Sequence, residues 1–133
     1  MWFLEELSKF QGLVQHNRPP AQQPIKVAIL DSGIDRNDVV VKRFIEKKGD
    51  ESTFIEKNCV AFPNTLHPLE DGNGHGTRCA ALLLRTAPDI ELFVVRIIND
   101  DGKMELGDDD YDYDCIVEAI SSLFAVLTFA VGS

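Results

Sequence analysis

Apolar positions recur along the chain with two different periods, and each period predicts a type of element. In residues 2–14 the apolar side chains stand three or four positions apart with charged residues between them, which is the period of an amphipathic helix. The members of this apolar face are Phe3, Leu7, Phe10 and Val14. We expect an N-terminal amphipathic helix over residues 1–15 that packs on its own domain, followed by an extended Pro-rich linker over residues 16–24.

A strand, a helix and a second strand are predicted further along the chain. Residues 25–30 form a short, nearly continuous apolar run, as in a strand buried on both faces of a parallel sheet. A largely apolar helix begins near His75 and ends before Pro88, and residues 91–98 form the next buried strand. This order predicts an α/β fold with a parallel crossover between the two strands.

The remaining segments have less regular patterns. Residues 39–45 and 54–62 are each expected to supply a short strand, and residues 63–74 are expected to form a long loop. Residues 114–126 return to helical spacing, and residues 127–131 are expected to begin another strand.

Composition restricts the classes of function. A chain of 133 residues suffices for one domain with a modest core. The net charge of -9 argues against nucleic acid and anionic membranes as partners. An odd number of cysteines without framework spacing, and a start that lacks the features of a secretory signal, favour an intracellular location. The weakly charged residues 115–133 are expected to form a buried helix and strand rather than a membrane anchor.

Two polar groups stand at the ends of predicted elements. Asp31 follows the first buried strand, and ligands and catalytic residues of open α/β sheets lie at the carboxyl ends of the strands. The alternative is a turn-forming Asp that caps the next segment. His75 stands in the first turn of the predicted helix, whose dipole favours the neutral imidazole that can accept a proton. We expect the two side chains to touch, so that the carboxylate fixes the tautomer of the ring.

Small residues surround the histidine. Gly74 and Gly76 leave space for an attacking group or a substrate, and Thr77 can satisfy free backbone amides near the helix start. Gly76 and Ala80 lie four residues apart and leave one side of the helix with almost no side chain. A second backbone is therefore expected to approach the helix closely on that side.

Two motifs of the chain resemble those of the subtilisin-like serine proteases. They are Asp31-Ser32-Gly33 after an apolar strand, and His75-Gly76-Thr77 followed by Cys79-Ala80-Ala81. The resemblance covers about residues 25–125 and implies a serine-type endopeptidase acting on polypeptides, with Asp31 as the orienting carboxylate and His75 as the general base. It also implies a partial three-layer α/β fold with a parallel sheet flanked by helices. Residues 25–133 would then form a truncated peptidase domain that is incomplete at its C-terminus. No cofactor is expected; calcium is possible by family analogy, but no ligand can be assigned.

The sequence also departs from that family. A nucleophile in a Gly-Thr-Ser-Met-Ala type motif and an oxyanion-hole Asn are absent, and none of the serines has such a setting: Ser8, Ser32, Ser52, Ser121, Ser122 and Ser133. The spacing between Asp31 and His75 implies an insertion around residues 46–58. We therefore expect no turnover by this chain alone.

Other classes of function are considered beside the hydrolase. A non-catalytic protein-interaction module derived from a protease would expose a sheet edge and self-associate through it. A metal site could use His75 and Cys79, four apart on a helix, with His67 or Cys59 as a further ligand. The spaced carboxylates of Asp110, Asp112 and Asp114 are not taken as an EF-hand loop, because Cys115 replaces the turn glycine and Ser121 the closing glutamate.

Overall fold

A computed structural model describes residues 2–17 and 23–104, together with residues 114, 117 and 121. Within these residues the elements follow one another as α1 (Trp2–Asn17), β1 (Lys26–Asp31), α2 (Val39–Lys48), α3 (Glu51–Asn58), β2 (Cys59–Ala61), α4 (His75–Thr86) and β3 (Glu91–Arg96). The helix and strand predicted for residues 114–131 lie outside the described residues, apart from three isolated helical positions. No helix of the described part is long and apolar enough to cross a membrane.

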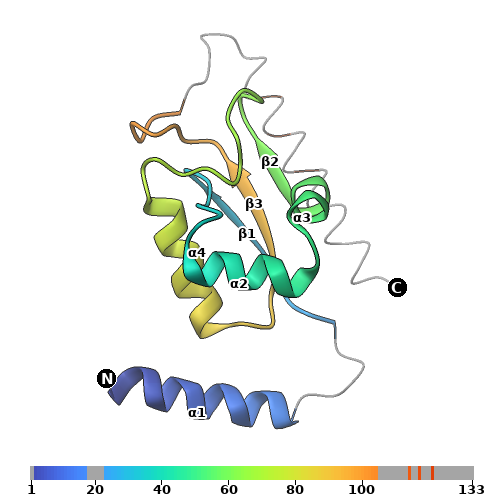
Figure 1. The fold of residues 1–133 in the computed structure, drawn as a ribbon, viewed down its shortest axis with the longest axis vertical. Helices are drawn as coiled ribbons and strands as arrows, with labels where there is room; N and C mark the ends of the chain where they lie inside the picture. The colour runs from blue at the N-terminus through green and yellow to red at the C-terminus, as the bar shows by residue number, and fades with distance from the viewer. Residues whose placement is uncertain (1, 18–22, 105–113, 115–116, 118–120, 122–133) are drawn as a thin grey trace.

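The three described strands form a parallel sheet in the order β1-β3-β2 (Figure 1). β1 and β3 pair from Lys26 opposite Glu91 to Asp31 opposite Arg96, so both strands end at the same edge. The predicted α/β class and the parallel pairing of the two apolar runs are confirmed. The sheet therefore brings the polar residue that ends β1 to an edge shared with the carboxyl end of β3.

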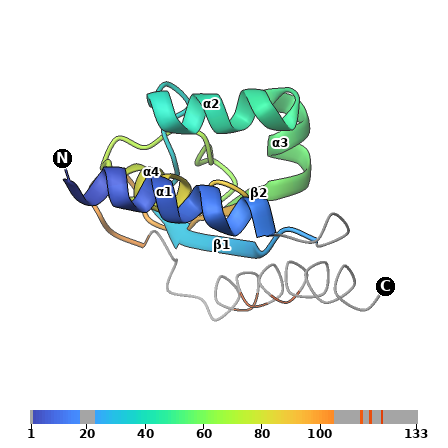
Figure 2. The ribbon, with the colours of Figure 1, turned by 90° about the horizontal axis from the view of Figure 1, so that it is seen from below.

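One hydrophobic core joins the sheet to the helices α2, α3 and α4. β3 contributes Leu92 and Val94 on one face, and α4 contributes Ala80 and Leu84. Figure 2 shows α2 and α3 lying along one side of β1. The remaining buried apolar members of this core are Ile34, Val41, Phe44, Ile45, Phe54, Leu69 and Ile90.

The strand predicted for residues 39–45 is wrong, because this segment is the helix α2. Its three consecutive valines favour a strand by propensity, but the Asp38 side chain caps a helix by accepting hydrogen bonds from the Val40 and Val41 amides. Phe44 then packs with Val41 in the core at helical spacing, so burial outweighs the propensity of the valines.

The strand predicted for residues 54–62 is only partly correct. Residues 51–58 form the helix α3, capped by the Asp50 side chain, and only residues 59–61 form β2. Helical geometry allows Phe54 to place its ring against Phe44, edge to face at 5.9 Å between centroids. The loop predicted for residues 63–74 contains no helix or strand.

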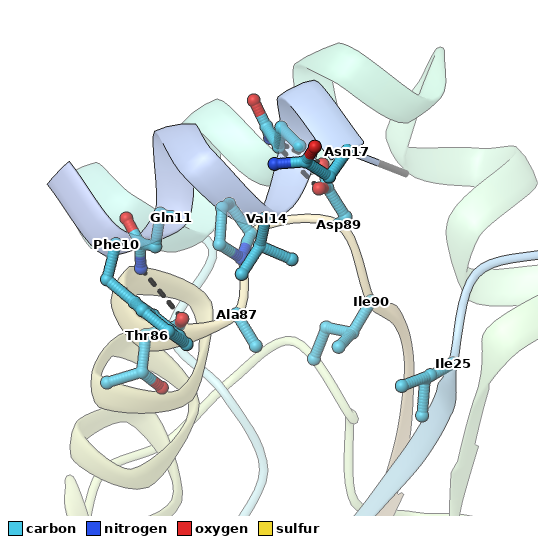
Figure 3. A pocket seen from close by; sticks show the side chains of 11 residues that line it. Phe10, Gln11, Val14, Asn17, Ile25, Thr86, Ala87, Asp89 and Ile90 are labelled. Carbon is cyan, nitrogen blue, oxygen red and sulfur yellow. Dashed lines mark hydrogen bonds between the residues drawn. The ribbon is translucent and has the colours of Figure 1, made fainter. Parts of the chain in front are cut away.

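The predicted N-terminal helix is present as α1, but it does not pack its apolar face on the domain. None of its residues is buried, and Phe10 is 63% exposed. The Gln11 side chain donates to the carbonyl oxygens of Arg85 and Thr86 at the end of α4, and Figure 3 shows α1 crossing there. A cavity of about 470 Å³ lies between Phe10 and Val14 of this face and residues 86–90. Polar contacts therefore hold α1 against the body of the protein.

Candidate active site

Asp31 and His75 meet where β1 ends and α4 begins. The Nδ1 atom of His75 lies 2.8 Å from the Oδ2 atom of Asp31, which is the contact expected from the sequence. The Asp31 side chain is 15% exposed, whereas the imidazole is 61% exposed. A fixed carboxylate thus holds one nitrogen of a ring that is open to solvent.

The Asp31 carboxylate is held from both sides. The Ser32 backbone amide donates to Oδ1 at 2.7 Å, which leaves Oδ2 directed at the histidine. The Asp31 backbone carbonyl accepts from the Ile97 amide at 2.9 Å, just beyond β3. The end of the sheet therefore fixes both the backbone and the side chain of this residue.

The start of α4 rests directly on the turn that follows β1. The Gly76 amide donates to the Ser32 hydroxyl at 3.0 Å, and Ser32 is only 1% exposed. A Cβ atom on Gly76 would stand 2.1 Å from the Gly33 carbonyl oxygen. The close backbone approach predicted on the Gly76 and Ala80 side of the helix is confirmed at Gly76, and Ala80 is fully buried.

Asp71 caps α4 from the preceding loop, a role that the sequence analysis missed. Its carboxylate accepts from the backbone amides of Gly74 and Thr77, both at 2.8 Å, and from the Thr77 hydroxyl at 2.5 Å. Burial acts to raise the pKa of Asp71, but hydrogen bonds from Thr77, Gly74 and Ser32 together hold that pKa below its ordinary value. The charged carboxylate also faces the positive end of the helix dipole.

Thr77 acts differently from the prediction. Its hydroxyl oxygen accepts a hydrogen bond from the Asp35 amide at 2.8 Å, and its hydroxyl group donates a hydrogen bond to the Asp71 carboxylate. The Thr77 hydroxyl therefore satisfies a backbone amide of the loop after β1. The backbone amide of Thr77 itself, in the first turn of α4, is satisfied by Asp71. No local pattern in the sequence marks the role of Asp71, because its carboxylate reaches these amides only when the loop is folded onto α4.

A second network supports the loop that leads to His75. Arg96, at the buried end of β3, donates to the His67 carbonyl oxygen at 2.9 Å and to the Asp100 carboxylate at 2.8 Å. Asp100 in turn accepts from the Gly72 amide at 2.9 Å. The sequence signal for this role was one basic residue inside an otherwise apolar strand.

Cys79 lies one turn along α4 from His75, with its Sγ atom 3.9 Å from the His75 Nδ1 atom. Asp31, His75 and Cys79 offer three ligand atoms within 4.8 Å of one another. The further ligands predicted from the sequence, His67 and Cys59, are not part of this cluster.

Both of those residues are engaged elsewhere in the fold. The ring of His67 contacts the Arg36 guanidinium, and its Nδ1 atom accepts from the Leu69 amide at 3.1 Å. Cys59 begins β2, which β3 separates from β1, and burial raises the pKa of its thiol to about 12. The carboxylate of Asp31 therefore replaces them as the third group near His75 and Cys79.

In the described part of the chain no serine side chain is hydrogen-bonded to the His75 ring. Ser32 is buried, with its hydroxyl held by the Gly76 amide. Ser8 belongs to α1, which meets the far end of α4, and α4 spans 12 residues, or about 18 Å. Ser52 belongs to α3, which packs on β2 and β3 rather than on β1.

The geometry of the pair determines what it can do chemically. A neutral imidazole whose Nδ1–H donates to a carboxylate keeps the lone pair of Nε2 for accepting a proton. The same carboxylate stabilises the imidazolium once that proton has been taken. The site can therefore provide a general base, the exposed His75 ring, together with the Asp31 carboxylate that orients it at the carboxyl end of β1.

Comparisons with known proteins agree on one relationship. The model of the subtilase family, Peptidase S8, matches residues 22–118. Subtilisin BL of Lederbergia lenta is 30% identical over an alignment of 106 residues, and the match covers 73% of this chain and 34% of that protein. Alkaline protease of Alkalihalobacillus alcalophilus is 30% identical over an alignment of 105 residues, and the match covers 72% of this chain and 24% of that protein. The chain thus spans between a quarter and about a third of the length of these relatives.

Proposed function

This chain belongs to the subtilase family, and on that basis we propose that it carries the carboxylate and the general base of a serine-type peptide hydrolase. In this proposal His75 accepts the proton of a serine hydroxyl as that oxygen attacks a peptide carbonyl. Asp31 orients the ring through Nδ1 and stabilises the imidazolium that forms. The substrate class is polypeptide, by relationship to the proteases that the chain resembles.

The observation that carries the proposal is the 2.8 Å contact between His75 Nδ1 and Asp31 Oδ2. Two residues 44 positions apart in sequence meet with the donor and acceptor atoms that this chemistry requires. Asp31 is kept in place by the Ser32 amide, so the ring does not have to recruit a mobile carboxylate. Pre-organisation of this kind is what makes a histidine an efficient base.

The nucleophile is the part of the chemistry that we do not assign to this sequence. Ser32 is buried and bonded to the Gly76 amide, and it supports the turn rather than attacking a substrate. We propose that the 133 residues by themselves have no hydrolytic turnover, and that a serine outside this sequence would complete the site. Without a nucleophile, an oriented base alone cannot form an acyl intermediate.

The contact is tested by proton NMR on the purified chain. A proton shared between imidazole Nδ1 and a carboxylate resonates far downfield, so the wild type should show this signal. Asp31→Asn should abolish it, whereas Asp35→Asn should leave it unchanged, because the Asp35 carboxylate accepts from the Asn37 amide instead. Absence of the signal in the wild type, or its survival in Asp31→Asn, would remove the basis of the proposal.

The chemistry is tested by grafting. Residues 22–118 would replace the matching segment of subtilisin BL, which retains its own serine region, and hydrolysis of a chromogenic peptide would be measured. We expect a folded chimera to hydrolyse the peptide, and Asp31→Asn to lower kcat by roughly 10⁴-fold, as loss of the orienting carboxylate does in other serine proteases. Asp35→Asn is the matched control and should retain activity.

Two results would contradict this assignment. A folded chimera whose activity is unchanged by His75→Ala would show that His75 is not the base. Stoichiometric labelling of the isolated 133-residue chain by a fluorophosphonate probe would show that it contains a working nucleophile.

A further inference from the structure

We propose that Asp31, His75 and Cys79 form a binding site for a zinc-class divalent cation. The site would use one carboxylate oxygen, the Nδ1 atom of the imidazole and one thiolate, with solvent in the fourth position. All three groups come from two elements, the end of β1 and the first two turns of α4.

The distances between the three side chains suit such a cation. Nδ1 of His75 lies 2.8 Å from Oδ2 of Asp31 and 3.9 Å from Sγ of Cys79, and all three ligand atoms lie within 4.8 Å of one another. Ligand atoms around a tetrahedral zinc stand roughly 3.3–3.6 Å apart, as follows from Zn–N and Zn–S bonds of about 2.0 and 2.3 Å. Rotation of the exposed Cys79 side chain, with a small opening of the Asp31 to His75 contact, brings the set to that spacing.

The chemistry of the donors selects the class of cation. A thiolate, an imidazole and a carboxylate together suit zinc and other borderline-soft transition metals, whereas calcium and magnesium prefer sites made of oxygen atoms. Three protein ligands with water in the fourth position are the coordination pattern of catalytic zinc sites. Cys79 and His75 are both exposed, so a hydrated cation can reach the cluster from solvent.

The scaffold presents these ligands with little freedom. The Ser32 amide holds the Asp31 carboxylate, and the Gly76 backbone rests on Gly33, so the first turn of α4 is fixed against the end of β1. His75 and Cys79 lie four apart on one helical face, which keeps their side chains adjacent. Binding therefore needs side-chain rotation but no change in the backbone.

Occupation of the site would change the protonation of the histidine. A cation on Nδ1 requires the imidazole proton to move to Nε2 and the Cys79 thiol to release its proton to solvent. Nε2 then carries a proton and has no lone pair to accept another. This consequence rests on the proposed function: if His75 is the general base, zinc binding and base catalysis exclude each other. The binding itself does not depend on that function.

The experiment is a titration of the full chain with Co²⁺, followed by displacement with Zn²⁺. Cys59 and Cys115 are first replaced by serine, so that Cys79 is the only thiol. We expect one equivalent of Co²⁺ to produce a thiolate-to-cobalt charge-transfer absorption, which Zn²⁺ removes. Cys79→Ser should abolish the absorption, and His75→Ala and Asp31→Asn should each weaken binding at least 10-fold.

Matched controls separate the cluster from its surroundings. Asp35→Asn and the restored Cys59 should leave affinity and absorption unchanged, and circular dichroism confirms that each variant is folded. No charge-transfer absorption at any Co²⁺ concentration, or unaltered affinity in folded His75→Ala, would overturn the inference. Because the readout is spectroscopic, loss of the metal site leaves the NMR and grafting results of the proposed function untouched. An inactive chimera, in turn, leaves this binding intact, because the cation needs only the juxtaposition of the three side chains.

Discussion

The substitution Gly76→Ala tests the junction that brings Asp31 and His75 together. The added Cβ atom would stand 2.1 Å from the Gly33 carbonyl oxygen, and the Gly33 nitrogen and carbonyl carbon would each be 3.2 Å away. All three neighbours are backbone atoms, so no side-chain rotation can relieve the contact. Ordinary contact begins near 3.4 Å, which means that α4 and the turn after β1 must separate by roughly 1.3 Å.

The energetic terms oppose one another. Alanine is favoured over glycine within a helix by roughly 0.5–1 kcal/mol. Overpacking costs about 1–3 kcal/mol, and the 3.0 Å bond from the Gly76 amide to the Ser32 hydroxyl would be stretched beyond hydrogen-bonding distance at a further cost of about 0.5–1.5 kcal/mol. We therefore expect the free energy of unfolding to fall by about 2 kcal/mol, with loss of the downfield Nδ1 proton signal of His75.

Urea unfolding followed by circular dichroism measures this change. Gly12→Ala is the matched control, because Gly12 is also helical but a Cβ atom there meets nothing within 4 Å. It should raise the helix content of α1 and leave the unfolding transition of the core no lower than in the wild type. If Gly76→Ala equals or exceeds the wild type in stability and keeps the Nδ1 signal, the backbone junction is not as described.

Four further predictions concern groups at the site and in the surrounding fold. Asp71→Ala should lower the free energy of unfolding by about 1–3 kcal/mol in urea titrations, because several donors at the start of α4 lose their acceptor; an unchanged midpoint would contradict the capping role. Folding lowers the pKa of Asp71 from its ordinary value of 3.8, so the ionised carboxylate stabilises the folded state above that pH. This stabilisation is lost as the pH falls through the folded pKa. In urea titrations the stability advantage of the wild type over Asp71→Asn should therefore shrink below about pH 4, and a growing advantage would contradict the assignment. Burial raises the pKa of Cys59 to about 12, so little thiolate exists at about pH 8, and mass spectrometry after iodoacetamide treatment should find the exposed Cys79 modified well before Cys59; equal rates would show that Cys59 is accessible. Arg96→Ala should cost about 1–3 kcal/mol in the same urea assay, because the part-buried His67 carbonyl and the Asp100 carboxylate lose their donor. Arg96→Lys should recover part of that loss.

The parts of the fold that the sequence predicted are those where period, length and end signals agree. The run ending at Asp31 is short, apolar and followed by a turn glycine, and it forms β1. The helix beginning at His75 is preceded by glycines and followed by Pro88, and it forms α4. Since both elements were identified, the meeting of the strand end with the helix start could also be predicted.

The parts that could not be predicted depend on tertiary packing and on local capping. The valines that begin α2 have strand propensity, and only the Asp38 cap and the buried spacing of the helix reveal its conformation. The face of α1 has a clear helical period, but the period does not tell whether that face is covered, and here it is exposed. Asp71 looked like one of many acidic loop residues, because its role appears only when the loop is folded onto α4.

The position of β3 between β1 and β2 affects how the chain emerges during synthesis. The central strand of the described sheet is the last of the three to be made, and each residue of β1 pairs with one 65 positions later. At translation rates of about 5–20 residues per second, β1 waits roughly 3–13 s for its partner. During that interval β1, and later β2 as well, have unpaired backbone edges. Until residue 96 has left the ribosome these two strands cannot complete the described sheet, and their edges stay open to pairing with other chains.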